Sequence, residues 1–232
     1  MKRSITLIAM AALVGLLCMS QPGKRDWAGL TRFAQANTEL LALAGTKVKV
    51  VFMGNSITEG WMEQHPQFFT ENGFVARGIS GQTSAQMLVR FRQDVINLHP
   101  KVVVILAGTN DVAENTGPYS LEHTMGNIVS MCELAKANDI KVVLCTLTPA
   151  NRFPWNPGIT DAAAKIETLN ARITAYAKQN KLQLVDYYTP LVTGHERAFD
   201  PGKSSDGVHP TLAGYAVMEP LVLKAIRKHV KK

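Results

Sequence analysis

Two short segments of the sequence hold side chains that could act together in nucleophilic catalysis. Residues 54–58 (GNSIT) contain Ser56, and residues 206–210 (DGVHP) contain Asp206 and, three positions later, His209. A serine hydroxyl is a weak nucleophile that needs a neighbouring base, and imidazole is the natural base near neutral pH. Asp206 can hold the imidazole in the tautomer that accepts the serine proton. These residue types predict nucleophilic catalysis by Ser56, with His209 as its base.

Two further segments offer groups that could stabilise the oxyanion of such a reaction. They are residues 78–82 (GISGQ) and residues 108–111 (GTND). The expected donors are the backbone N–H groups of Ser56 and Gly81 and the side-chain amide of Asn110. Taken singly, a serine after a strand is usually a helix cap, an Asn-Asp pair a turn, and a glycine a tight bend. Their joint occurrence favours the catalytic interpretation.

Alternating strand and helix patterns predict the scaffold that positions these segments. Near-continuous Val, Ile and Leu runs, typical of parallel strands covered on both faces, predict strands at residues 47–53, 74–79, 101–107, 140–147 and 182–185. Helical spacing predicts helices at residues 27–43, 84–98, 120–137, 161–179 and 211–228. The alternation indicates an α/β fold, a flavodoxin-like three-layer α/β/α sandwich around an open parallel sheet of about five strands. Ligands of such sheets bind beyond the carboxyl ends of the strands, where we expect all four segments to lie.

Together, the four segments resemble the sequence blocks of the SGNH hydrolases, also called the GDSL-like lipase/acylhydrolase family. The resemblance covers about residues 47–228 and rests on GNSIT, GISGQT, GTND and DGVHP. It implies that Ser56 is the nucleophile, that Gly81 and Asn110 donate hydrogen bonds to the oxyanion, and that His209 is the base. It also implies the three-layer fold and the hydrolysis of esters.

Two comparisons with related motifs refine this interpretation. Asn55 stands where the strict GDS form of the motif has Asp, which bears on substrate detail rather than on the reaction. The α/β-hydrolases, an alternative class, need Gly-x-Ser-x-Gly at a sharp turn, whereas here Thr58 lies two residues after Ser56. Their acid and base also usually lie far apart in sequence, unlike Asp206 and His209.

The segment GNSITEGW also resembles secreted carbohydrate acetylesterases and the acetylhydrolases related to platelet-activating-factor hydrolases. We therefore expect a serine esterase that removes a small acyl group, acetyl first, from a hydroxyl-bearing small molecule or carbohydrate. Lysophospholipase or thioesterase activity, and a non-catalytic carbohydrate-binding protein, stay open as alternatives. Trp155, in the loop 151–158, is a candidate wall of the substrate pocket. Trp61, Phe68 and Phe69, expected to follow the helix that begins at the nucleophile, are predicted to pack in the core, with the wall of an acyl or sugar pocket as the alternative.

The first residues have the three parts of a secretory signal. A positive start precedes a mostly apolar run over residues 5–17, which is too short to span a membrane, and small residues follow. We expect residues 1–20 to be a signal peptide, and residues 21–232 to form a single exported domain, periplasmic or extracellular, with no integral membrane segment. Lipoprotein anchoring through Cys18 and an uncleaved anchor are the alternatives.

The formal net charge of +7 does not indicate a nucleic-acid partner. Residues 1–20 carry two of the excess positive charges and residues 221–232 carry five, so the charges between these two segments balance. Cys132 and Cys145 have no Cys or His at metal-ligand spacing, and we predict two buried free thiols, no metal and no cofactor. The other histidines, His65 among them, have no evident partner and are assigned no role.

Overall fold

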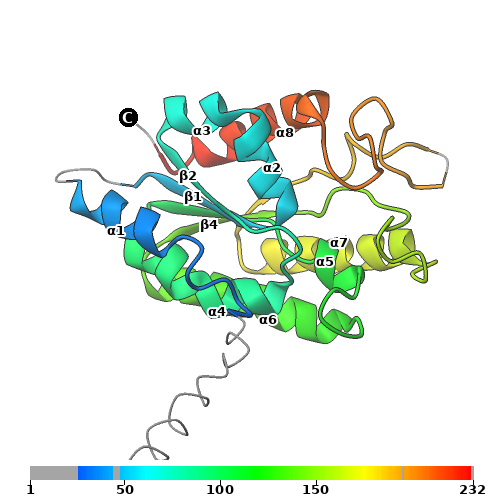
Figure 1. Cartoon of the computed structure of the whole chain (residues 1–232), viewed down its shortest axis with the longest axis horizontal. Helices are drawn as coiled ribbons and strands as arrows, with labels where there is room; N and C mark the ends of the chain where they lie inside the picture. Colours follow the sequence, from blue (N-terminus) through cyan, green and yellow to red (C-terminus); the bar gives the residue numbers. More distant parts are fainter. Residues whose placement is uncertain (1–25, 44–47, 195, 231–232) are drawn as a thin grey trace, which may run out of the picture.

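A five-stranded parallel sheet forms the centre of the computed structural model, which describes residues 26–43, 48–194 and 196–230 (Figure 1). The strands lie in the order β2-β1-β3-β4-β5, and their bounds are β1 Val50–Gly54, β2 Phe74–Gly78, β3 Val102–Ile105, β4 Lys141–Cys145 and β5 Gln183–Val185. All five predicted strands and the α/β class are thereby confirmed. Most strands are shorter than the apolar runs that predicted them, because residues such as Leu106 and Leu147 stay buried beyond the end of the strand.

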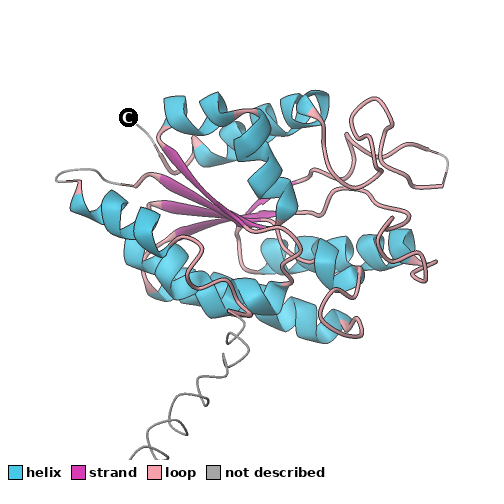
Figure 2. Ribbon diagram, viewed as in Figure 1, coloured by secondary structure: helices cyan, strands magenta, loops and turns pink. Residues whose placement is uncertain are grey.

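Successive residues of each strand point to opposite faces of the sheet, and each face has its own hydrophobic core. From β1, Val51 and Met53 pack in the core that includes helices α4 (Ser84–Asp94), α6 (Leu121–Ala137) and α7 (Ala162–Gln179). Val50 and Phe52 pack in the other core, with helices α2 (Ser56–Gln64), α3 (Pro66–Asn72) and α8 (Leu212–Ile226). Figure 2 shows the sheet lying between these two helical layers, which is the predicted three-layer sandwich.

The helices differ from the predicted ranges where local hydrogen bonds interrupt them. The first, α1, covers only Ala34–Ala42, because the Asp26 carboxylate binds the N–H groups of Leu30 and Thr31 and closes a turn before the helix begins. Helix α4 ends at Asp94 and is followed by a separate 3-10 turn, η1 (Ile96–Leu98). Helices α3 and α5 (Thr109–Val112) were not predicted, since such short helices show no clear periodicity.

The predicted core aromatics are confirmed. Trp61, Phe68 and Phe69 are at most 5% exposed, and all three rings lie within 6 Å of the Phe52 ring. Trp61 lies inside α2, however, rather than after it. The two predicted free thiols, Cys132 and Cys145, are likewise confirmed as buried and unpaired with each other.

None of the helices within residues 26–43, 48–194 and 196–230 is long and apolar enough to cross a membrane. The predicted signal peptide and Cys18 lie outside the described residues.

Candidate active site

The segments that directly follow β1, β2 and β3 meet at one edge of the sheet, because these strands are neighbours with β1 in the middle. They carry Ser56, Gly81 and Asn110, respectively. Gly78, the last residue of β2, allows α2 to approach this edge closely. A Cβ at this position would lie only 2.7 Å from the carbonyl oxygen of Asn55. The absent side chain therefore brings the start of α2 and the end of β2 together.

Ser56 is the first residue of α2, and Asn55 is its N-cap. The Asn55 side-chain oxygen accepts a hydrogen bond from the Ile57 N–H at 3.0 Å, the capping role for which Asn and Asp are almost equally suited. The asparagine in place of the strict motif's aspartate thus preserves the local structure. The first N–H groups of a helix lack intrahelical partners, and the helix dipole makes this end positive. A negative charge that develops beside Ser56 is consequently favoured.

Ser56, His209 and Asp206 form a continuous hydrogen-bonded row. The Ser56 Oγ lies 2.8 Å from His209 Nε2, and His209 Nδ1 lies 2.6 Å from Asp206 Oδ2. The other carboxylate oxygen of Asp206 accepts hydrogen bonds from the backbone N–H groups of Val208 and His209, at 2.9 and 2.8 Å. This carboxylate therefore contacts the ring and also shapes the loop that carries it. The order of groups is the one that proton transfer from a serine requires.

The Asp206 carboxylate is negatively charged at neutral pH. Burial raises the pKa of Asp206, but hydrogen bonds from the His209 ring and from the backbone N–H groups outweigh burial and hold the pKa below its ordinary value. A permanent negative charge next to the imidazole stabilises the positive charge that the ring gains when it takes a proton.

The other two predicted oxyanion donors lie in the segments that follow the neighbouring strands, Gly81 in a turn after β2 and Asn110 in helix α5 after β3. Gly81 has φ of +76°, in the left-handed region that favours glycine, and is the third residue of a turn closed by the Gln82 N–H and the Ile79 carbonyl at 3.3 Å. Asn110 is 3% exposed, and its Nδ2 donates one hydrogen bond to the Gln82 carbonyl at 2.9 Å. An amide nitrogen carries two hydrogens, so one remains for a second acceptor.

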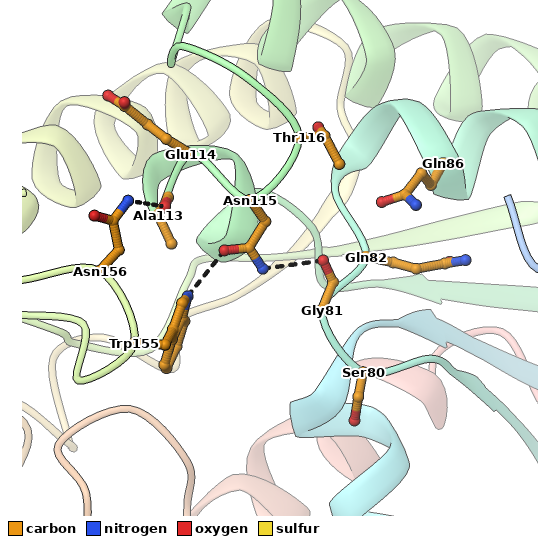
Figure 3. Close-up of a pocket in the computed structure, with 10 residues that line it drawn as sticks. All are labelled: Ser80, Gly81, Gln82, Gln86, Ala113, Glu114, Asn115, Thr116, Trp155 and Asn156. Atoms are coloured by element: carbon orange, nitrogen blue, oxygen red, sulfur yellow. Dashed lines mark hydrogen bonds between the residues drawn. The ribbon is translucent and has the colours of Figure 1, made fainter. Parts of the chain in front are cut away.

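An open pocket of about 460 Å³ lies beside the turn that contains Gly81, which forms part of its wall (Figure 3). The Trp155 ring, 45% exposed, forms part of the wall, and its centroid lies 6.0 Å from that of the His209 ring. The Trp155 Nε1 donates a hydrogen bond to Asn115 Oδ1 at 2.9 Å, which fixes the indole. The structure thus places the predicted pocket-wall residue beside the candidate base. Most of the other lining residues are polar and include Gln82, Gln86, Glu114, Asn115 and Asn156.

Three polar contacts near the site were not foreseen from the sequence. Asp111, beside Asn110, accepts hydrogen bonds from the Ser84 N–H and hydroxyl and from the Thr124 hydroxyl, so it holds the start of α4. The sequence showed no partner for His65, but its Nδ1 lies 2.6 Å from Oε1 of Glu219 on α8.

The third contact is made by Arg90, which is fully buried. Its guanidinium donates to the Gly54 and Arg77 carbonyls at the ends of β1 and β2 and to the Gln82 side chain, and it pairs with Asp94. Arg90 lies next to Phe91 on the buried face of α4, and a charged residue among apolar ones on a helix could have indicated such a buried contact. In the part of the chain that the structure describes, no three His, Cys, Asp or Glu residues are grouped as metal ligands would be.

A Ser-His-Asp row beside candidate oxyanion donors, at the carboxyl edge of an open parallel sheet, defines a serine hydrolase site. Residues 52–217 match the GDSL-like lipase/acylhydrolase family, and the chain belongs to this family. It is accordingly a serine carboxylic ester hydrolase, as predicted.

Three relatives illustrate the range of the family. The solved structure of a candidate acylhydrolase from Bacteroides fragilis is 59% identical, with a TM-score of 0.86 over 88% of this chain and 99% of that one. Esterase TesA of Pseudomonas aeruginosa is 29% identical over 77% of this chain and 83% of its own. An acetylxylan esterase of Xylanibacter ruminicola is 25% identical over 78% of this chain and 43% of its own.

Proposed function

We propose that this esterase removes a small acyl group, acetyl in the first place, from a hydroxyl group of a carbohydrate, through an acyl-enzyme on Ser56. The observation that carries the reaction is the 2.8 Å contact between Ser56 Oγ and His209 Nε2, with Asp206 on the far side of the ring. A hydroxyl in this position can lose its proton as it attacks.

The first half of the reaction transfers the acyl group to the protein. The Ser56 Oγ attacks the ester carbonyl carbon while its proton passes to His209 Nε2, and the carbonyl oxygen becomes an oxyanion. The N–H groups of Ser56 and Gly81 and the free amide hydrogen of Asn110 are the proposed donors to this oxyanion. When the intermediate collapses, the bond to the alcohol oxygen breaks, and the alcohol takes the proton from His209 Nε2.

The second half regenerates the serine. A water molecule gives a proton to His209 Nε2 and attacks the acyl carbon, so a second oxyanion forms at the same donors. Collapse of this intermediate returns the proton to Ser56 Oγ and releases the carboxylic acid. Throughout the cycle, Asp206 remains ionised and only stabilises the charged ring.

The pocket supports the proposed substrate. Half of its ten lining residues carry an amide or a carboxylate, and one is an exposed aromatic residue, Trp155, whose position is fixed by Asn115. Sugars present hydroxyl groups, which match such amides, and apolar C–H faces, which pack against a ring. A long fatty acyl chain would find few apolar partners on this surface. The resemblance to an acetylxylan esterase points in the same direction.

A substrate series tests the proposal. Rates on p-nitrophenyl esters should be highest for acetate and fall steadily toward palmitate, and acetate should be released from acetylated xylan. Rates that increase with chain length would contradict the small-acyl proposal and favour a lysophospholipase or thioesterase activity. Ser56→Ala should abolish both the hydrolysis and the covalent labelling by a fluorophosphonate probe. Wild-type protein that resists the probe would indicate a non-catalytic binding protein.

Residues 1–20 and 21–232 are proposed to be a cleaved export signal and a single mature domain. The mass of the protein recovered from the periplasm or medium of expressing cells tests this. An intact mass retained in the cytoplasm would contradict export, and a diacylglyceryl adduct on Cys18 would show the lipoprotein alternative.

A further inference from the structure

The three proposed oxyanion donors come from three separate elements of the protein. The Ser56 N–H lies at the start of α2, the Gly81 N–H lies in the turn at residues 79–82, and the Asn110 amide lies in α5. An oxyanion accepts three hydrogen bonds only if these elements keep fixed positions relative to one another. The Gly81 N–H, which lies in a turn rather than a helix, therefore needs contacts that hold it in place.

The turn at residues 79–82 is anchored unevenly. Gln82 is 4% exposed, and Asn110 and Arg90 both bind it. Ser80 and Gly81 are exposed, and neither has a side chain that could pack into a core. The exposed half of the turn, which includes the Gly81 N–H, therefore depends on hydrogen bonds from outside the turn.

Glu59 holds one end of this exposed half. It lies on α2, three residues after Ser56, and its Oε2 accepts hydrogen bonds from the Ser80 N–H, at 2.7 Å, and from the Ser80 hydroxyl. Its Oε1 pairs with Arg32 at 3.2 Å. Burial raises the pKa of Glu59, but the hydrogen bonds from Ser80 and Arg32 outweigh burial and hold the pKa below its ordinary value. The Glu59 carboxylate is therefore charged at neutral pH.

Asn115 holds the other end. Its Nδ2 donates to the Gly81 carbonyl at 3.1 Å, while its Oδ1 accepts from the Trp155 indole at 2.9 Å (Figure 3). Asn115 lies just beyond α5, and its own N–H binds the Asn110 carbonyl at 3.1 Å. Glu59 thus connects the turn to the element of Ser56, and Asn115 connects it to the element of Asn110.

We propose that Glu59 and Asn115 are positioning residues that hold the Gly81 N–H in register with the other two oxyanion donors. The proposal rests on the oxyanion role of Gly81 proposed above. Neither residue needs to touch the substrate for this role. Each fixes a peptide next to the Ser80–Gly81 peptide, so that the donor keeps its place when charge develops on the oxyanion. A misplacement of about 1 Å can cost on the order of a hundredfold in rate.

The test separates positioning from binding and from folding. With p-nitrophenyl acetate, Glu59→Ala and Asn115→Ala should each lower kcat by roughly tenfold and change KM by less than twofold. The loss of kcat is smaller than the roughly hundredfold loss of a full misplacement, because each variant releases only one end of the turn. Glu59→Gln should recover most of kcat, because its amide oxygen can still accept from Ser80. With selective ¹⁵N-glycine labelling, the Gly81 amide signal should shift or broaden in both alanine variants.

Two matched controls remove similar groups without releasing the turn. Arg32→Ala removes the second partner of Glu59, and Asn138→Ala removes another exposed amide that donates to a carbonyl, that of Leu134 on α6. Both should keep wild-type kcat. If Glu59→Ala and Asn115→Ala also stay within twofold of wild-type kcat, or raise KM alone, the positioning role is wrong. Wild type and Ser56→Ala, measured alongside, separate this result from failure of the proposed function, because in that failure the two proteins would have equal activity, whether both hydrolyse the ester or neither does.

Discussion

The Asn110 side chain donates only one of its two amide hydrogens to a described protein group, the Gln82 carbonyl. Its contact with the Gln82 carbonyl fixes the plane of the amide, so the second hydrogen has a defined direction before any substrate arrives. A carboxylate in this place would have no hydrogen for either bond. Asparagine thus suits the proposed role of a buried donor that is already oriented.

We expect Asn110→Ala to lower kcat by a factor on the order of 10²–10³, with a much smaller change in KM. A donor aimed at the oxyanion stabilises the transition state rather than the bound ester. Steady-state kinetics on p-nitrophenyl acetate measure both constants. A raised KM at unchanged kcat would instead make Asn110 a substrate-binding residue.

His209 should be more important for the rate than Asp206. His209→Ala should fall to the activity of Ser56→Ala, because no neighbouring group can take its protons. Asp206→Asn should stay at least tenfold above that level, since the backbone still directs the ring. Steady-state kcat/KM values of the three variants on p-nitrophenyl acetate, measured side by side, test this ranking.

The two oxygens of Asp206 allow its roles to be separated. Asp206→Asn can still accept from the backbone of Val208 and His209, whereas Asp206→Ala loses these loop contacts too. The alanine variant should therefore also unfold at a lower temperature. Equal loss of activity in His209→Ala and Asp206→Asn would refute the ranking.

Most of the individual groups around Ser56 could be predicted, but not their supports. Ser56, Gly81, Asn110, Asp206 and His209 lie in short polar segments after strands, so residue type and position both indicated them. Glu59 contacts Ser80, which lies 21 positions away, and Asn115 contacts Gly81, 34 positions away. Arg90 contacts the Gly54 carbonyl, 36 positions away. No local pattern shows such contacts, since they depend on how separate elements pack.

At the scale of elements, glycines at two turns provide an internal comparison. Gly81 (φ +76°) and Gly73 (φ +65°) both have left-handed backbone, and a Cβ would meet no atom closer than 3.8 Å at either position. Gly73 ends α3, whereas Gly81 lies in the turn of the candidate oxyanion site. An added methyl group would therefore strain both turns without a collision at either.

Gly73→Ala and Gly81→Ala should each lower the free energy of unfolding by about 1–2 kcal/mol, the cost of left-handed backbone for alanine. Only Gly81→Ala should also lower kcat, because the strain falls on the turn that carries the donor. Urea unfolding and steady-state kinetics on both variants provide the comparison. Equal kcat values in the two variants would show that the conformation of the Gly81 turn does not matter to the reaction.

Element types were easier to predict than element ends. Buried parallel strands such as β3 show as continuous apolar runs, whereas α5 has only four residues and no room for a helical period. The start of α1 was predicted too early because the Asp26 side chain competes for N–H groups that a helix would otherwise use.

At the scale of the whole molecule, the sequence could predict a shared sheet edge but not the neighbours along it. The order β2-β1-β3 makes Ser56, Gly81 and Asn110 adjacent. A five-stranded parallel sheet permits other orders, and only packing of the helices on the two faces selects among them. The contact of His209 with Ser56 joins the loop before α8 to the start of α2, across 153 positions of sequence.

Acid should destabilise the protein partly through Asp206. Its folded pKa is below the unfolded value of about 3.9, so its contribution is complete above that value and is lost as pH falls through the folded pKa. The free energy of unfolding should therefore decrease below about pH 4, and less steeply in Asp206→Asn. Urea unfolding between pH 6 and pH 2 measures both slopes, and parallel curves would contradict this assignment.

The 153 residues that separate Ser56 from His209 also bear on how the protein is synthesised. When β1 to β5 have left the ribosome, the proposed nucleophile and oxyanion donors are present, but the proposed base is not. On the proposed mechanism, a nascent chain cannot hydrolyse esters until residues 206–226 have emerged and α8 has docked. The appearance of esterase activity during translation would therefore report completion of the fold, and release of a chain stopped before residue 206 should yield an inactive protein.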